Sequence, residues 1–128
     1  MEMSKNKTFF GALKVAGLGL FVAFFSERNM KIHALAAGLT VFAAYFFDIS
    51  ATHFALLLLC IGIVVSLELV NSALELVVDL VTKEFNPLAK KAKDTAAAAV
   101  LFASIVSVFI AILIFTQYFS LLKNWGLF

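Results

Sequence analysis

The chain has 128 residues, of which 63% are hydrophobic and only 14% are charged. Soluble globular domains average about 45–50% apolar and about 25% charged residues, and the mean hydropathy of +1.04 excludes that class. The length allows a single domain, residues 1–128, and the composition predicts an all-α integral membrane protein. The formal net charge of +2 is small, and no nucleic-acid partner is expected.

The first predicted helix covers residues 9–26, and Lys14 is its only charged residue. A membrane-spanning helix needs about 20 apolar residues, so a helix of about 18 residues is borderline. It could cross the membrane, or it could lie in the membrane interface. The orientation of the chain bears on this choice.

Three further helices are predicted as membrane spans, at about residues 31–47, 54–81 and 94–119. Ser50 or Thr52 is the candidate N-cap in the turn before the second span, and Pro87 marks the loop before the third. The second span has about 28 residues, roughly 42 Å at 1.5 Å per residue, which exceeds a hydrocarbon core of about 30 Å. Its far end must therefore project into water.

The positions of lysine and arginine predict the orientation. Nine of the ten lie before the first span or between the second and third, and Lys123 alone follows the last. Since basic flanking segments stay in the cytoplasm, the N-terminus and the loop before the last span are expected there. A first helix that crossed would place Lys5, Lys7 and Lys14 outside. The sequence therefore predicts an N-terminal interfacial helix followed by three transmembrane helices.

A polar stripe interrupts the second span. At about 100° per residue, five polar residues share about 100° of one helix face: Glu68, Asn71, Ser72, Glu75 and Asp79. A carboxylate in hydrocarbon costs roughly 2.5–3.5 kcal/mol on insertion scales, so the stripe must face protein, a cation or water. Counted from Phe54 at one surface, Glu68 lies about 9 Å inside the opposite surface and Glu75 just beyond it.

Carboxylates beside a lysine-rich loop are typical of a phosphoryl-transfer site. Mg²⁺ binds one or two carboxylates together with nucleotide phosphates, and Glu27 and Glu75 are expected at the same depth, which makes both candidate metal ligands. Glu68, the deepest carboxylate, is the candidate general base for a lipid hydroxyl. Alternatively, Glu27 and Glu75 could form salt bridges, and Glu68 could be a protonated interior residue. Asp79 is expected to be structural, and His33 to be a core histidine.

Three spaced motifs resemble the bacterial family of small integral-membrane lipid kinases, the diacylglycerol and undecaprenol kinases. They are E-R-N-M-K-I-H at residues 27–33, E-L-V-N-S-A-L-E-L-V-V-D at residues 68–79 and A-K-D-T-A-A-A-A-V at residues 92–100. The resemblance covers nearly the whole chain. It implies a homotrimer in the bacterial cytoplasmic membrane, with sites completed between neighbouring chains.

The resemblance also implies roles for individual residues. It makes Glu68 the catalytic base, and Glu27 and Glu75 the ligands of Mg²⁺. The residues that it implies at the MgATP site are Glu27, Asn71, Glu75, Lys93 and Asp94. Without the resemblance, Asn71 could form a hydrogen bond between helices, and Asp94 would complement the dipole at the start of the last span. No Walker loop or glycine-rich kinase loop is present, so the resemblance alone names ATP.

The expected function is transfer of the ATP γ-phosphate to a lipid alcohol at the cytoplasmic leaflet. Undecaprenol is the expected substrate, because E-R-N-x-x-I-H looks closer to the undecaprenol kinases of Gram-positive bacteria; diacylglycerol is the alternative. The first helix departs from both groups, since between Lys14 and Glu27 it lacks the basic and tryptophan residues common there. A proton-coupled transporter would use Glu68 near the membrane midplane, and a structural membrane subunit would need no polar stripe.

Overall fold

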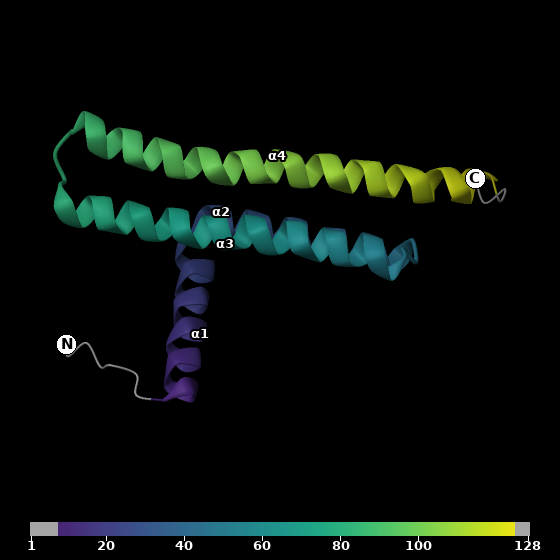
Figure 1. Cartoon of the computed structure of the whole chain (residues 1–128), viewed down its shortest axis with the longest axis horizontal. Helices are drawn as coiled ribbons and strands as arrows, with labels where there is room; N and C mark the ends of the chain where they lie inside the picture. The colour runs from purple at the N-terminus through teal and green to yellow at the C-terminus, as the bar shows by residue number, and fades with distance from the viewer. Residues whose placement is uncertain (1–7, 125–128) are drawn as a thin grey trace.

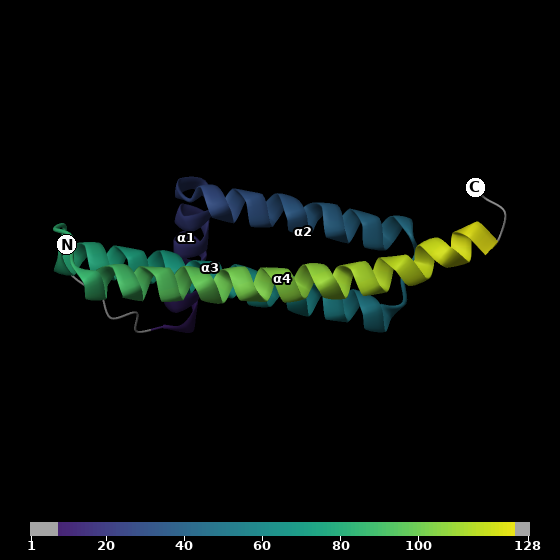
Figure 2. The ribbon, with the colours of Figure 1, turned by 90° about the horizontal axis from the view of Figure 1, so that it is seen from above.

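The computed structural model describes residues 8–124, and these form four α-helices: α1 (Phe9–Ser26), α2 (Arg28–Phe46), α3 (Ala51–Val81) and α4 (Pro87–Asn124). α2, α3 and α4 lie side by side, and α1 runs across their direction (Figures 1 and 2). α3 contacts each of the other helices and packs most extensively against α4. The predicted all-α architecture, with three spans preceded by a separate N-terminal helix, is confirmed.

Composition and arrangement favour different helices as the third span. By length and hydropathy, α1, α3 and α4 could each cross a membrane, whereas polar residues in its first two turns keep α2 out of this set. However, α2 lies alongside α3 and buries Met30 and Ala44, whereas α1 buries no residue. The arrangement favours α2, and its 19 residues reach about 28 Å, close to the thickness of the hydrocarbon core. The interfacial position of α1 stays a prediction.

The turn between α2 and α3 differs slightly from the predicted one. α3 begins at Ala51 rather than at residue 54, because the Ser50 hydroxyl caps it and accepts a hydrogen bond from the backbone N–H of His53 at 3.4 Å. Ser50 is thus confirmed as the N-cap. Asp48 adopts a left-handed backbone conformation with φ of 48°, which short polar side chains tolerate. These two residues reverse the chain tightly enough for α2 to lie against α3.

The last helix begins earlier than the predicted span, which was expected to start at about residue 94. α4 begins at Pro87, where the missing N–H costs nothing because the first helical position has no partner for it. The Asn86 side chain caps the helix: its Oδ1 accepts hydrogen bonds from the backbone N–H groups of Leu88 at 2.8 Å and Ala89 at 3.3 Å. α4 therefore begins about two turns earlier than the sequence predicts.

Tyr118 of α4 ties the α2–α3 turn to the end of the bundle. Its hydroxyl accepts a hydrogen bond from the Ser50 backbone N–H at 2.9 Å and lies 2.9 Å from His53 Nδ1. Beside it, one side chain from each spanning helix is buried in a small core cluster: Ala44, Leu57 and Ile114. Most other large apolar side chains are exposed, which suits a bundle whose solvent is lipid.

Tyr118→Phe tests this attachment, because it removes the hydroxyl and keeps the ring. The Ser50 N–H and the His53 ring then lose a partner, so we expect a loss of about 1–3 kcal/mol, seen as a lower unfolding temperature in detergent. Tyr45→Phe is the control, since Tyr45 is 87% exposed and its hydroxyl makes no hydrogen bond within residues 8–124. Equal unfolding temperatures for the two variants would contradict the assignment.

Candidate functional site

Two residues of the polar stripe are buried in a molecule that buries very little. Glu68 is 2% exposed and Asn71 5% exposed, and they are the only polar members of the buried set among the described residues. No hydrogen bond or ion pair involves the Glu68 side chain within residues 8–124. Glutamate is almost never fully buried without a partner. The burial of Glu68 therefore calls for a ligand or a chemical role.

Asn71 and Glu75 form a hydrogen-bonded pair one turn from Glu68. Asn71 Nδ2 donates to Glu75 Oε1 at 3.1 Å, and Asn71 Oδ1 is buried with no partner in the described part of the chain. This fixes the amide so that its oxygen is left free as an acceptor. Amide and carboxylate oxygens are ligands that Mg²⁺ accepts, so the pair fits a magnesium-bound phosphate group.

A groove of about 540 Å³ lies between α3 and α4 beside this pair. Asn71 lines it from α3, and Lys91 and Thr95 line it from α4. Three alanines of α4 also line it: Ala92, Ala96 and Ala99. Asn71 is the only residue of the stripe in its lining, which is otherwise mostly apolar.

Glu27 lies at the junction of α1 and α2. It ends α1 and precedes α2 in an extended conformation, with φ of −94° and ψ of 126°, and its side chain caps neither helix. α1 contacts both α2 and α3, so the junction lies against the bundle (Figure 1). Among the described residues, no group of three or more His, Cys, Asp or Glu side chains is assembled for a metal ion. The joint role of Glu27 and Glu75 stays a prediction.

Two of the three lysines at the start of α4 are already paired with carboxylates. Lys93 forms an ion pair with Asp79 of α3, and Lys90 forms one with Asp94, four residues along α4. Asp79 thus has the structural role expected of it, since it joins the ends of the two helices. Asp94 lies two turns into α4, so its predicted position at the helix start is wrong. Exposed pairs contribute only about 0–1 kcal/mol, so a ligand phosphate can replace them.

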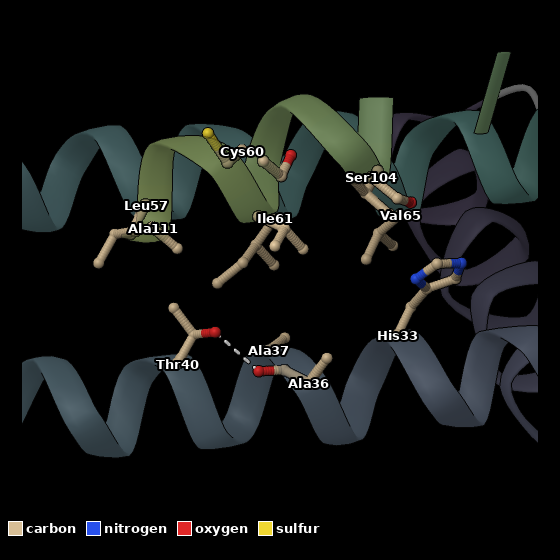
Figure 3. Close-up of a pocket in the computed structure, with 13 residues that line it drawn as sticks. His33, Ala36, Ala37, Thr40, Leu57, Cys60, Ile61, Val65, Ser104 and Ala111 are labelled. Carbon is tan, nitrogen blue, oxygen red and sulfur yellow. Dashed lines mark hydrogen bonds between the residues drawn. The ribbon is translucent and has the colours of Figure 1, made fainter. Parts of the chain in front are cut away.

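Sequence reasoning missed a cavity of about 120 Å³ between α2, α3 and α4 (Figure 3). His33, which was expected to be an ordinary core histidine, lines it, and so does Ser104, which no motif contains. The available signal was helical spacing: Ile61, Val64 and Val65 precede Glu68 by seven, four and three residues and so share its face.

Comparison with known proteins agrees with this arrangement. Residues 14–115 match the prokaryotic diacylglycerol kinase family. The chain is 40% identical over 107 residues to the undecaprenol kinase of Bacillus subtilis (strain 168), covering 84% of this chain and 87% of that protein. It is 41% identical over 100 residues to a diacylglycerol kinase of Synechocystis sp., covering 77% of this chain and 57% of that protein. It is 37% identical over 110 residues to the diacylglycerol kinase of Escherichia coli (strain K12), covering 83% and 90%.

Three findings lead to one conclusion. The central one of the four helices carries a buried glutamate, lysines lie at the start of the last helix, and the undecaprenol kinase relative is matched over most of its length. The chain belongs to the prokaryotic diacylglycerol kinase family and is a membrane lipid kinase, an ATP-dependent phosphotransferase.

Proposed function

We propose that this chain transfers the γ-phosphate of MgATP to undecaprenol at the cytoplasmic leaflet of a bacterial membrane. The observation that carries the proposal is Glu68, a buried carboxylate without a protein partner among residues 8–124, one turn from the Asn71–Glu75 pair. The 40% identity to an undecaprenol kinase supports the choice of lipid. Diacylglycerol is the second candidate, because relatives of similar identity bear that name.

Glu68 is proposed as the general base. In an apolar environment its carboxylate is a strong hydrogen-bond acceptor, and a lipid hydroxyl can reach it without leaving the bilayer. As the hydroxyl oxygen bonds to the γ-phosphorus, the hydroxyl proton passes to Glu68 and the bond to the bridging oxygen of ADP breaks. Such a base contributes about 10²–10⁴-fold to a rate.

The MgATP site is proposed to lie on the polar side of Glu68. Glu75, with its partner Asn71, would hold Mg²⁺ together with Glu27. When bound, Mg²⁺ offsets the charge that develops on the transferring phosphoryl group. Lys93 would neutralise phosphate charge after leaving its weak pair with Asp79, and Asp94 would support the nucleotide.

The assembly is proposed to be a homotrimer with its N-terminus in the cytoplasm and α1 in the interface. α1 buries no residue, and its apolar side chains are exposed along its whole length. Three spanning helices alone also leave the stripe beyond Glu68 and Asn71 partly open. Neighbouring chains and lipid together would cover both surfaces.

The function is tested with purified protein in micelles that contain MgATP and either undecaprenol or diacylglycerol. We expect ATP consumption only when a lipid alcohol is present, with radioactive γ-phosphate recovered on the lipid and a higher kcat/KM for undecaprenol. Preference for diacylglycerol would support the second candidate. Proton flux without lipid phosphorylation would support the transporter that the sequence left open.

Glu68→Gln tests the general base, because glutamine keeps the shape of the side chain but does not accept the proton. Turnover should fall about 10²–10⁴-fold, while MgATP still protects the protein from heat or protease. The unfolding temperature should rise, because a buried unpaired charge is removed. Glu84→Gln, at an exposed position of the α3–α4 loop, should change neither quantity. Normal turnover in Glu68→Gln would exclude the assignment.

Glu27→Gln and Glu75→Gln test the shared metal ion. Each should abolish most activity, and the double variant should be no worse than either single one, since losing one ligand already empties the site. The unfolding temperature of each variant checks that it folds. The affinity for ATP is measured at several Mg²⁺ concentrations, to show whether the variant still binds the metal ion. Two modest losses that multiply in the double variant would instead indicate separate surface roles.

A further inference from the structure

The cavity between the three spanning helices is suited to an apolar chain. Its lining is mostly aliphatic and comes from α2, α3 and α4 (Figure 3). An apolar cavity of about 150 Å³ in another protein binds benzene, so a cavity of about 120 Å³ accommodates a segment of about five carbon atoms. It has room for one hydrocarbon chain beside the helices, and not for two.

The cavity continues the face of α3 that carries Glu68. Ile61, Val64 and Val65 line it and lie within two turns of Glu68 on the same side of the helix. One helical turn advances about 5.4 Å. The end of the cavity at Val65 therefore lies about one turn deeper in the bilayer than the proposed base.

Ser104 brings an unpartnered hydroxyl to that end of the cavity. Its Oγ is buried and has no hydrogen-bond partner within the described residues. Other hydroxyls on the cavity wall donate to the preceding turn of their own helix: Ser107 to the Ala103 carbonyl at 2.7 Å, and Thr40 to the Ala36 carbonyl at 2.8 Å. In Figure 3, Ser104 lies at the same end of the cavity as Val65 and His33.

We propose that Ser104 hydrogen bonds the hydroxyl of the incoming lipid alcohol, and that the cavity holds the first carbons of its single chain directly below Glu68. A hydroxyl inside hydrocarbon is costly unless it is hydrogen-bonded; this holds for the lipid and for Ser104 alike, and each supplies the partner that the other lacks. The His53–Tyr118 and Asp79–Lys93 contacts set the register of the two helices so that Ser104 lies at about the level of Glu68. Ser104 is thus a positioning residue that receives the substrate hydroxyl beside the base. The proposal rests on the proposed function and favours a prenol over a two-chain lipid.

Ser104→Ala is the direct test. Losing one hydrogen bond to the substrate should raise KM for undecaprenol about three- to tenfold, with kcat and KM for MgATP within a factor of two of wild type. The unfolding temperature without lipid should stay the same or rise, because a buried unpaired hydroxyl is removed. A purely structural role would lower it. Ser107→Ala is the matched control: it lines the same cavity, but its hydroxyl is already bonded, so lipid KM should not change.

A photoreactive prenol that carries a diazirine near its hydroxyl gives a readout independent of turnover. Cross-links should map to the cavity walls of α3 and α4 and should weaken in Ser104→Ala but not in Ser107→Ala. An unchanged lipid KM in Ser104→Ala, or cross-links confined to other surfaces in an active enzyme, would overturn this inference and leave the proposed function intact. Cavity labelling by a prenol that the enzyme never phosphorylates would overturn the proposed function instead.

Discussion

A carboxylate held inside a bilayer is the constraint on which this molecule depends. Glu68 is among the most buried side chains of the bundle, and an ionised group there costs several kcal/mol unless something compensates. The position of Glu68 limits that cost: α3 is the central helix, and its neighbours bury Glu68 and Asn71. Glu75, one turn further on, is half-buried, and Asp79 is exposed. The bundle thus forms a gradient from hydrocarbon to water along a single helix face.

Polar side-chain contacts join the helices at both ends of this bundle. At one end the Tyr118 hydroxyl joins α4 to the α2–α3 turn, and at the other Asp79 and Lys93 join α3 to α4 across the loop. Between them the helices share few buried side chains, because lipid, unlike water, does not drive apolar faces together. The middle of the bundle can therefore keep a cavity without a large loss of stability.

The sequence predicted most of the fold because its signals were strong and local. Apolar runs of the right length, a single proline, Ser50 as a cap and a stripe at helical spacing sufficed for four helices and for the face that carries Glu68. The start of α4 was missed, because the cap by Asn86 lies in a polar stretch that reads as loop. Hydropathy favours α1 over α2 as a span, whereas the positions of lysine and arginine favour α2, as does its more extensive packing against α3.

The site was predictable only where chemistry follows from one helix. Glu68, Asn71 and Glu75 share a face, and their order along α3 needs no partner element. The pairs of Lys93 with Asp79 and Lys90 with Asp94 depend on where α4 begins, and Ser104 depends on which side of α4 meets the cavity. The Lys93–Asp79 pair and the position of Ser104 result from the register between two antiparallel helices, whereas the Lys90–Asp94 pair joins residues four apart and requires only that α4 begin before Lys90.

The long α4 has a consequence for how phosphate can be bound without a phosphate-binding loop. Its 38 residues extend about 57 Å, roughly twice the thickness of the hydrocarbon core, so its capped first turns hold Lys90, Lys91 and Lys93 on rigid helix. A flexible loop must lose conformational entropy when it closes around a nucleotide, at about 1–2 kcal/mol per ordered residue. Here that ordering is complete when the protein folds. At the proposed nucleotide site, affinity would then be limited by the exchange of ion partners rather than by the ordering of the chain.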